Sequence, residues 1–301
     1  MLKLLQLKDG RATLQSLTYQ RATSIGEAVS LLQNGGDTAR VLAGGTDLIV
    51  QARERKRDVS LLVDVKHIPE LIGISYSPDT GLVIGAATPL YQVYGNKDVK
   101  EYYPSIVEAS SVIGGTAIQG RASLGGNLCN SSPAGDSLTA MMAINAIAHI
   151  AGPQGERDVP VADFFTGPGR NVLEAGEFVV NIHIAPHQSG TGGAWQRFIP
   201  RNEMDIAVVN CGTYLALENG SVTNARVALG AVAATPIMVP TISEILIGQA
   251  FNDEIIDMAA DAASEAATPI EDMRGSVKQR KHLAGVLTKR TLVIAAERAQ
   301  S

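Results

Sequence analysis

The first ninety residues alternate between short apolar segments and amphipathic ones. Apolar residues recur at helical spacing over residues 23–35, between a Thr-Ser cap and a pair of glycines, and predict a short amphipathic helix. The segments that follow predict, in order, a strand at ARVLAG (39–44), a helix at LIVQARERK (48–56), a strand at SLLVDVKHI (60–68) and a hairpin over 71–88. Gly44-Gly45 therefore lies at a strand-to-helix junction, where free backbone N–H groups can face an anion.

The middle of the chain is expected to contain a helix, a long glycine-rich loop and further strands. The pattern predicts a helix over 102–113, a hairpin over 149–165 and a strand over 178–186. Between the helix and the hairpin lies RASLGGNLCNSSPAGDSLTAMM (121–142), which becomes an apolar helical run only from Leu138. A simple connection uses about two to five residues, so a loop this long and rich in small residues indicates backbone that approaches a ligand.

The C-terminal part has the pattern of a sheet followed by helices. Strands are predicted at 195–201, 205–217 and 222–237, and helices around 242–266 and 276–299. The Gly-rich HQSGTGG (187–193) before them is expected to be a linker. The sequence thus predicts an α+β protein with one domain over 1–187, in two lobes of about 1–75 and 76–187, and a second domain over 193–301.

Composition and charge argue against several classes of function. The 301 residues suffice for two domains, and the formal net charge of −5 lacks the basic bias of a nucleic-acid-binding protein. No segment approaches the ~18 apolar residues of a membrane span. The N-terminal apolar patch is broken by Lys3 and Lys8 and does not resemble a secretory signal, so a cytoplasmic protein is expected. Cys129 and Cys211 match no metal-cluster spacing, and we expect no metal site on this chain.

Two glycine segments are the candidate binding motifs. Neither AGGTDL (43–48) nor the GGN at 125–127 has the spacing of a Rossmann fingerprint or a P-loop. Taken alone, Gly44-Gly45 is equally well explained as a tight turn. Together, two such segments with hydroxyl residues beside the glycines could hold a diphosphate through backbone N–H groups, without a cationic side chain.

These motifs, in this order, define a resemblance. AGGTDL followed by ASLGGNLCNSSPAGD (122–136) resembles the FAD-binding medium subunit of molybdenum hydroxylases, the family of xanthine dehydrogenase and aerobic carbon monoxide dehydrogenase. The resemblance covers about residues 19–295 and includes Arg201, Asp205 and Ala207 in an R-x-x-x-D-x-A pattern. It implies a two-lobed vanillyl-alcohol-oxidase-type (PCMH-type) FAD domain, followed by a C-terminal domain of sheet and helices. It also implies FAD on this chain, a molybdopterin cofactor on a large partner subunit and [2Fe–2S] clusters on a small one, in a dimer of heterotrimers.

Carried over residue by residue, the resemblance implies a set of cofactor-binding positions. The first pyrophosphate loop would consist of Val41, Leu42, Ala43, Gly44, Gly45, Thr46, Asp47 and Leu48. The second would consist of Ser123, Leu124, Gly125, Gly126 and Asn127. Ile113 would lie near the adenine, Cys129 against the isoalloxazine ring, and Val179 on the flavin. Asp136 would bond ribityl or ribose hydroxyls, and Arg197 stands where the family usually has a Lys beside the ring.

Several of these residues also have a simpler structural explanation. Asp136 could instead cap a helix that starts at Ser137. Asp47 is better explained as a charge in the first turn of a helix than as a catalytic base, and Cys129 as a packing residue than as a modulator of the flavin. No catalytic acid, base or nucleophile is predicted on this chain.

The expected function is therefore that of an electron-transfer flavoprotein subunit. It would take electrons from the [2Fe–2S] clusters of a partner and pass them to NAD, oxygen or another acceptor, with the redox chemistry residing in the flavin. Two alternatives stay open. One is a stand-alone flavoenzyme of the same fold, resembling UDP-N-acetylmuramate reductase, in which Ser131 or Ser132 would be the candidate proton donor. The other is a nucleotide-binding structural subunit without flavin.

Overall fold

A computed structural model describes residues 17–301 of the chain. It confirms an α+β protein, and its N-terminal part contains a small parallel sheet in the order β1-β3-β2. The elements of this part are β1 (Thr18–Arg21), α1 (Ile25–Gly35), β2 (Ala39–Leu42), α2 (Leu48–Arg53) and β3 (Leu61–Asp64). The prediction that the N-terminus is no secretory signal falls on residues 1–16, outside the described part.

A second, antiparallel sheet follows in the order β4-β5-β10-β6-β7. Its strands are β4 (Ile74–Ser77), β5 (Gly81–Gly85), β6 (Ile147–Gly152), β7 (Gly155–Pro160) and β10 (Phe178–Ile184), and the two predicted hairpins are confirmed as β4–β5 and β6–β7. The connection from β5 to β6 contains α3 (Leu90–Gly95), α4 (Lys97–Tyr102), α5 (Pro104–Ser110), α6 (Thr116–Gln119), α7 (Leu124–Asn130) and α8 (Asp136–Ala143). A small hairpin, β8 (Phe165–Gly167) and β9 (Arg170–Asn171), precedes β10.

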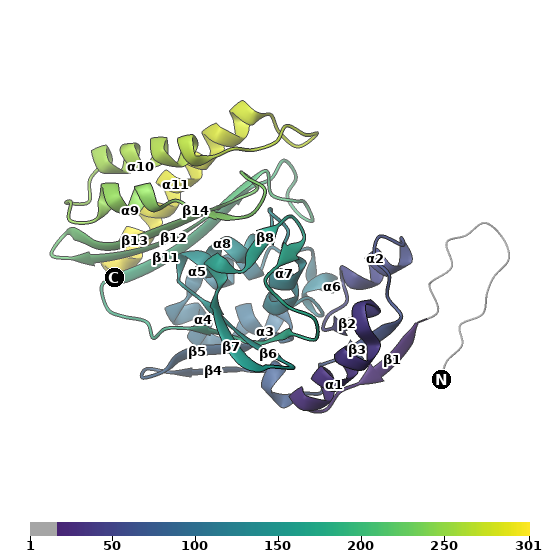
Figure 1. Ribbon diagram of the computed structural model, residues 1–301. Coiled ribbons are helices and arrows are strands. Elements are labelled where there is room, and N and C mark those ends of the chain that lie inside the picture. The colour runs from purple at the N-terminus through teal and green to yellow at the C-terminus, as the bar shows by residue number, and fades with distance from the viewer. Residues whose placement is uncertain (1–16) are drawn as a thin grey trace.

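The C-terminal part is a four-stranded antiparallel sheet with helices on one face. Its elements are β11 (Thr191–Phe198), β12 (Val209–Glu218), β13 (Ser221–Gly230), β14 (Ile237–Met238), α9 (Pro240–Leu246), α10 (Asp253–Ala266) and α11 (Val277–Ala299). Helices α9 to α11 lie over one face of this sheet, and α5 and α8 pack against the strands from the other side (Figure 1). Helix α8 is consequently enclosed between layers, and all eight of its residues are buried.

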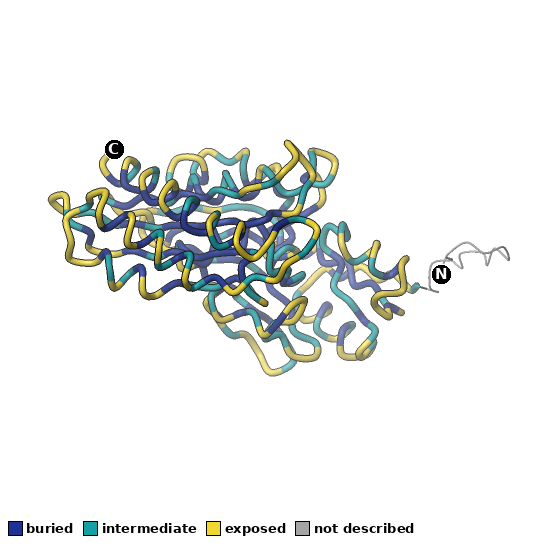
Figure 2. Tube along the Cα trace, turned by 90° about the horizontal axis from the view of Figure 1, so that it is seen from above, coloured by how far each residue is buried: buried dark blue, intermediate teal, exposed yellow. Residues whose placement is uncertain are grey.

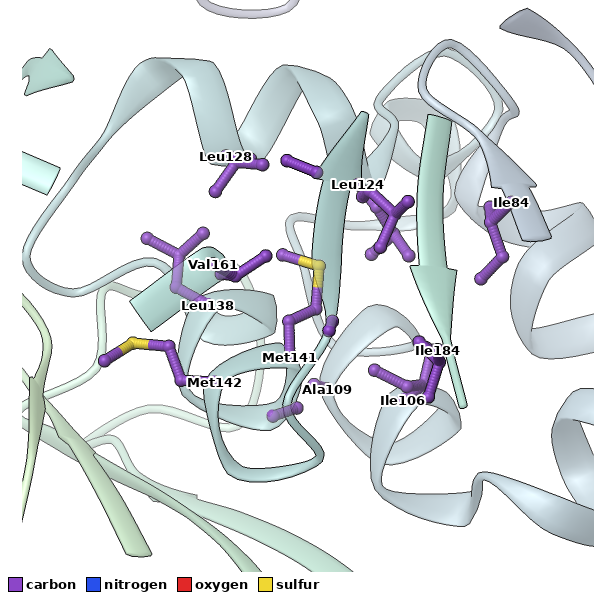
Figure 3. Packing of buried hydrophobic residues seen from close by; sticks show 14 of the residues in the cluster. Ile84, Ile106, Ala109, Leu124, Leu128, Leu138, Met141, Met142, Val161 and Ile184 are labelled. Atoms are coloured by element: carbon purple, nitrogen blue, oxygen red, sulfur yellow. The ribbon is translucent and has the colours of Figure 1, made fainter. Parts of the chain in front are cut away.

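The largest hydrophobic core lies around α7 and α8. Leu124 and Leu128 from α7 meet Leu138 and Met141 from α8 in this core (Figure 3). Buried residues run through the middle of the molecule, while exposed residues are concentrated in loops and along the outer helices (Figure 2). This packing holds α7 and α8 rigidly, which matters because both carry residues of the predicted site.

Three predicted helices were wrong in extent. The helix expected at 48–56 ends at Arg53, because Arg55 adopts a left-handed conformation (φ 55°) and the Lys56 amide bonds back to the Gln51 carbonyl. The helix expected over 102–113 is interrupted before Pro104, whose ring lacks an N–H and is tolerated only at a helix start. The region 242–266 forms two helices separated by Gly248, which has φ +84°.

The predicted linker HQSGTGG (187–193) was also wrong in part. Strand β11 already begins at Thr191 and pairs with β12. A Cβ on Gly192 would overlap the backbone carbonyl oxygen of Ala295, so this glycine allows β11 to pack closely against α11. Residues 199–208, which were expected to be largely strand, form a loop instead.

None of the helices in residues 17–301 is both long enough and apolar enough to span a bilayer.

Candidate functional site

One large cavity opens where the N-terminal sheet faces the helices that follow β5. Its volume is about 1090 Å³, slightly above the ~300–1,000 Å³ usual for small-molecule sites. Both glycine segments line it, together with residues from the edge strand β2, the end of α1 and the segment 171–179. The cavity wall therefore combines residues from the N-terminal sheet with residues from the helices after β5 and from the segment before β10. A cavity lined in this way can hold an extended ligand between these elements.

The first glycine segment turns the chain from β2 into α2. Gly45 has φ +77°, a left-handed conformation that favours glycine. Within the described part of the chain, no residue accepts a hydrogen bond from the backbone amides of Gly44, Gly45 or Thr46. Asp47 occupies the N-cap position of α2, but its side chain does not cap the helix. These amides are free to donate to a ligand.

The second glycine segment is helical, and its prediction as a loop was wrong. Gly125, Gly126 and Asn127 lie in the first turns of α7, whose N-cap Ser123 accepts a hydrogen bond from the Gly126 amide through Oγ (3.1 Å). The Gly125 amide donates to the Ala86 carbonyl (3.1 Å). The Asn127 amide donates to the Ser123 carbonyl (3.0 Å), so all three amides of this segment are already bonded within the protein. Its glycines contribute by allowing close approach of other atoms.

The first glycine segment lies against the backbone just before the second. A Cβ on Gly44 would overlap the backbone carbonyl of Arg121, and a Cβ on Gly125 would lie 2.5 Å from the Ala86 carbonyl oxygen. Further along, Gln51 of α2 donates to the Asn130 side chain of α7 (3.3 Å). Only glycine permits the close approaches at positions 44 and 125. Both segments line the cavity.

Asp136 provides a buried carboxyl group on the cavity wall. Its Oδ2 accepts a hydrogen bond from Arg197 Nη1 (2.6 Å), and both side chains are less than a tenth exposed. Among the described residues, nothing bonds to its buried Oδ1. Helix α8 begins at Asp136 with Gly135 as its N-cap, so the alternative that Asp136 caps a helix starting at Ser137 was wrong. An unbonded buried oxygen on a residue that lines a cavity fits an acceptor for a ligand hydroxyl.

Burial controls the proton affinity of Asp136. It raises the pKa of this carboxyl to about 7, although Arg197 acts in the opposite direction. Cys129, also on the cavity wall, is partly buried, and the loss of hydration raises the pKa of its thiol to about 12. A thiol with that pKa stays neutral, which favours the packing interpretation of Cys129.

All but three of the predicted cofactor residues line this cavity. The predicted residues that line the cavity are Val41, Ala43, Gly44, Gly45, Thr46, Asp47, Leu48, Ile113, Ser123, Gly125, Gly126, Asn127, Cys129, Asp136 and Val179. Leu42 and Leu124 instead belong to hydrophobic clusters. Arg197 does not line the cavity but bonds to two residues that do, the Asp136 carboxyl (2.6 Å) and the Asp205 carbonyl oxygen (3.4 Å).

Sequence reasoning missed two other parts of the cavity wall. One is formed by residues from α1 and β2, including Gln33 and Arg40, and the other by the segment 173–178. Neither part contains a motif. Asp205 and Ile206 also line the cavity, and the R-x-x-x-D-x-A pattern was the signal that could have identified this position.

The pKa of Asp136 predicts an unusual pH dependence of stability. An unfolded Asp titrates near ~3.9, so from about pH 4 to pH 7 the folded protein retains a proton that the unfolded chain has lost. The stability that protonated Asp136 confers at low pH is therefore lost as pH rises. Relative to Asp136→Asn, the free energy of unfolding of the FAD-free wild type should fall by about 1.4 kcal/mol per pH unit across this interval. Denaturant unfolding measures this difference, and a pH-independent difference would contradict the assignment.

Comparisons with known proteins identify the family of both parts of the chain. Residues 14–187 match the FAD binding domain in molybdopterin dehydrogenase, and residues 196–295 match the CO dehydrogenase flavoprotein C-terminal domain. The chain is 31% identical to the xanthine dehydrogenase FAD-binding subunit of Escherichia coli O157:H7, over 91% of this chain and 94% of that protein. It is 33% identical to the carbon monoxide dehydrogenase medium chain of Hydrogenophaga pseudoflava, over 91% and 95%.

A solved structure shows the same fold. Carbon monoxide dehydrogenase from Hydrogenophaga pseudoflava, in a form that lacks the Mo-pyranopterin moiety of its molybdenum cofactor, superimposes with a TM-score of 0.91 at 33% identity. The match covers 95% of this chain and 99% of that chain. The fold and site thus define an FAD-binding domain of the molybdopterin dehydrogenase type. The chain belongs to the family of FAD-binding medium subunits of xanthine and carbon monoxide dehydrogenases, and is an oxidoreductase subunit.

Proposed function

We propose that this chain binds one FAD in the 1090 Å³ cavity and acts as the electron-transfer subunit of a molybdenum hydroxylase. The observation that carries the proposal is that both glycine segments and Asp136, whose buried Oδ1 has no partner among the described residues, line one cavity. Such a wall suits an extended dinucleotide, with the diphosphate at the glycines and a sugar hydroxyl at the carboxylate.

Individual residues would have distinct roles in holding the cofactor. The amides of Gly44, Gly45 and Thr46 would donate to the diphosphate, and Gly126 would leave space beside it. Asp136 would accept from a ribityl or ribose hydroxyl, held in place by Arg197. When bound, FAD supplies the redox chemistry, while the protein binds and orients it.

The electrons would come from a partner subunit with [2Fe–2S] clusters and leave to NAD, oxygen or another acceptor. The substrate would be oxidised at a molybdopterin cofactor on a large subunit, in a dimer of heterotrimers. In support, the chain spans 94% and 95% of the lengths of relatives named as an FAD-binding subunit and a medium chain. No acid–base pair for a separate reaction is assigned to this chain.

Purification of the tagged chain from its native host tests this assignment. We expect two co-purifying chains, identified by mass spectrometry, with molybdenum and iron found by elemental analysis. Substrate should bleach the visible flavin absorbance of the complex but not of the separated chain. An isolated chain that alone oxidises a nicotinamide and reduces a small substrate would overturn the proposal in favour of a stand-alone flavoenzyme.

A further inference from the structure

A lysine outside the cavity bonds to the first glycine segment. Lys66 follows β3, and its Nζ donates to the carbonyl oxygen of Ala43 (3.0 Å), the residue directly before Gly44. AGGTDL itself contains no lysine or arginine. Lys66 does not line the cavity, so it contacts this segment from a side that does not face the ligand space.

A buried carboxylate fixes the position of the Lys66 ammonium group. Asp64, only 4% exposed, accepts from Lys66 Nζ (2.7 Å) and from the Lys66 backbone amide (2.9 Å) through Oδ1. Its Oδ2 accepts from the Tyr19 hydroxyl (2.6 Å). Burial alone would raise the pKa of Asp64, but the hydrogen bonds from Lys66 and Tyr19 hold it below its usual value, so Asp64 stays ionised. The ammonium is thus held in one place by a charged partner.

The bond to Ala43 has a geometric consequence for the next amide. In a trans peptide the C=O and the following N–H lie in one plane and point in opposite directions. Because Lys66 holds the Ala43 carbonyl on its own side, the Gly44 N–H must point away from Lys66. That amide has no acceptor among the described residues, and Gly44 lines the cavity.

We infer that Lys66 is a positioning residue for the cofactor: it orients the Ala43–Gly44 peptide so that the Gly44 N–H donates to the diphosphate. The inference rests on the proposed function, because it needs a diphosphate at the first glycine segment. Asp64 and Tyr19 support the same arrangement by holding the ammonium group.

Three variants of the full chain test this role. Lys66→Met removes the donor, Lys66→Arg keeps both charge and donors, and Lys100→Met removes an exposed lysine of α4 as a control. FAD dissociation constants come from quenching of flavin fluorescence, and thermal midpoints are measured on the FAD-free proteins. We expect Lys66→Met to bind FAD about tenfold more weakly, with Lys66→Arg and Lys100→Met close to wild type. The FAD-free midpoint of Lys66→Met should fall as well, because Asp64 loses its cationic partner, so FAD binding is measured well below every midpoint.

Two results would overturn the inference. One is wild-type FAD affinity in Lys66→Met. The other is a loss that Lys66→Arg does not repair and that follows the thermal midpoint of the FAD-free protein, which would mark Lys66 as merely structural. Failure of the wild-type chain to bind FAD at all would instead contradict the proposed function, so the two failures are distinguishable.

Discussion

Replacing Gly126 with valine is expected to weaken FAD binding by about 10- to 100-fold while the fold is retained. Gly126 is exposed on the cavity wall, and a Cβ there would meet only Ser123 Oγ, at 3.1 Å. The valine side chain would therefore occupy space intended for the ligand. Inserting atoms into a filled site costs about 1–3 kcal/mol, and each 1.4 kcal/mol is a tenfold change in affinity. Equilibrium dialysis against FAD measures the loss.

The choice of glycine decides whether this test is informative. Gly44→Ala and Gly125→Ala would clash with backbone atoms of Arg121 and Ala86, so these variants would lose stability as well as FAD. Gly95→Val is a suitable control, because a Cβ at Gly95 meets nothing within 4 Å and Gly95 does not line the cavity. A Gly126→Val protein that retained full flavin would refute the assignment of the second glycine segment.

Replacing Arg197 with methionine is expected to destabilise the protein by about 3 kcal/mol above neutral pH. The variant leaves the Asp136 carboxylate buried without its cationic partner, and breaking a buried pair on one side typically costs ~3–5 kcal/mol. Protonation of Asp136 limits the loss, which is why the lower value is expected. The loss should shrink as the pH falls to about 7, because below that pH Asp136 is protonated with or without Arg197.

Denaturant unfolding at two pH values provides the measurement. Lys289→Met serves as a control, because the ion pair of Lys289 with Asp257 is largely exposed and should contribute little. If Arg197→Met were no less stable than Lys289→Met at pH about 8, the Asp136–Arg197 pair would not be the buried contact described above.

Local pattern predicted the elements whose boundaries are set by neighbouring residues. The helix α1, the two hairpins β4–β5 and β6–β7, and the long C-terminal helix α11 follow from periodicity, turn residues and caps. The helix α7 did not, because glycines at 125 and 126 oppose helix formation locally. Its Ser123 cap and the close contact with Ala86 outweigh that preference, and neither is visible in a local pattern.

In the candidate site, too, some residues were predictable from local sequence and others depend on tertiary packing. The glycine segments have sequence signatures, and the family resemblance added Asp136 and Arg197 as separate residues. Their pairing joins positions 61 residues apart, on α8 and β11, and depends on how the C-terminal sheet packs against α8. The wall formed by α1, β2 and residues 173–178 arises only from packing of the two sheets, so no motif marks it.

The most direct test of the central claim is the number of FAD molecules bound per chain after reconstitution and gel filtration. Visible absorbance of the bound flavin, compared with the protein concentration, gives this number. The two-segment site predicts one FAD per wild-type chain and a marked loss in Gly126→Val. A folded wild-type chain that remained colourless after reconstitution would contradict the account.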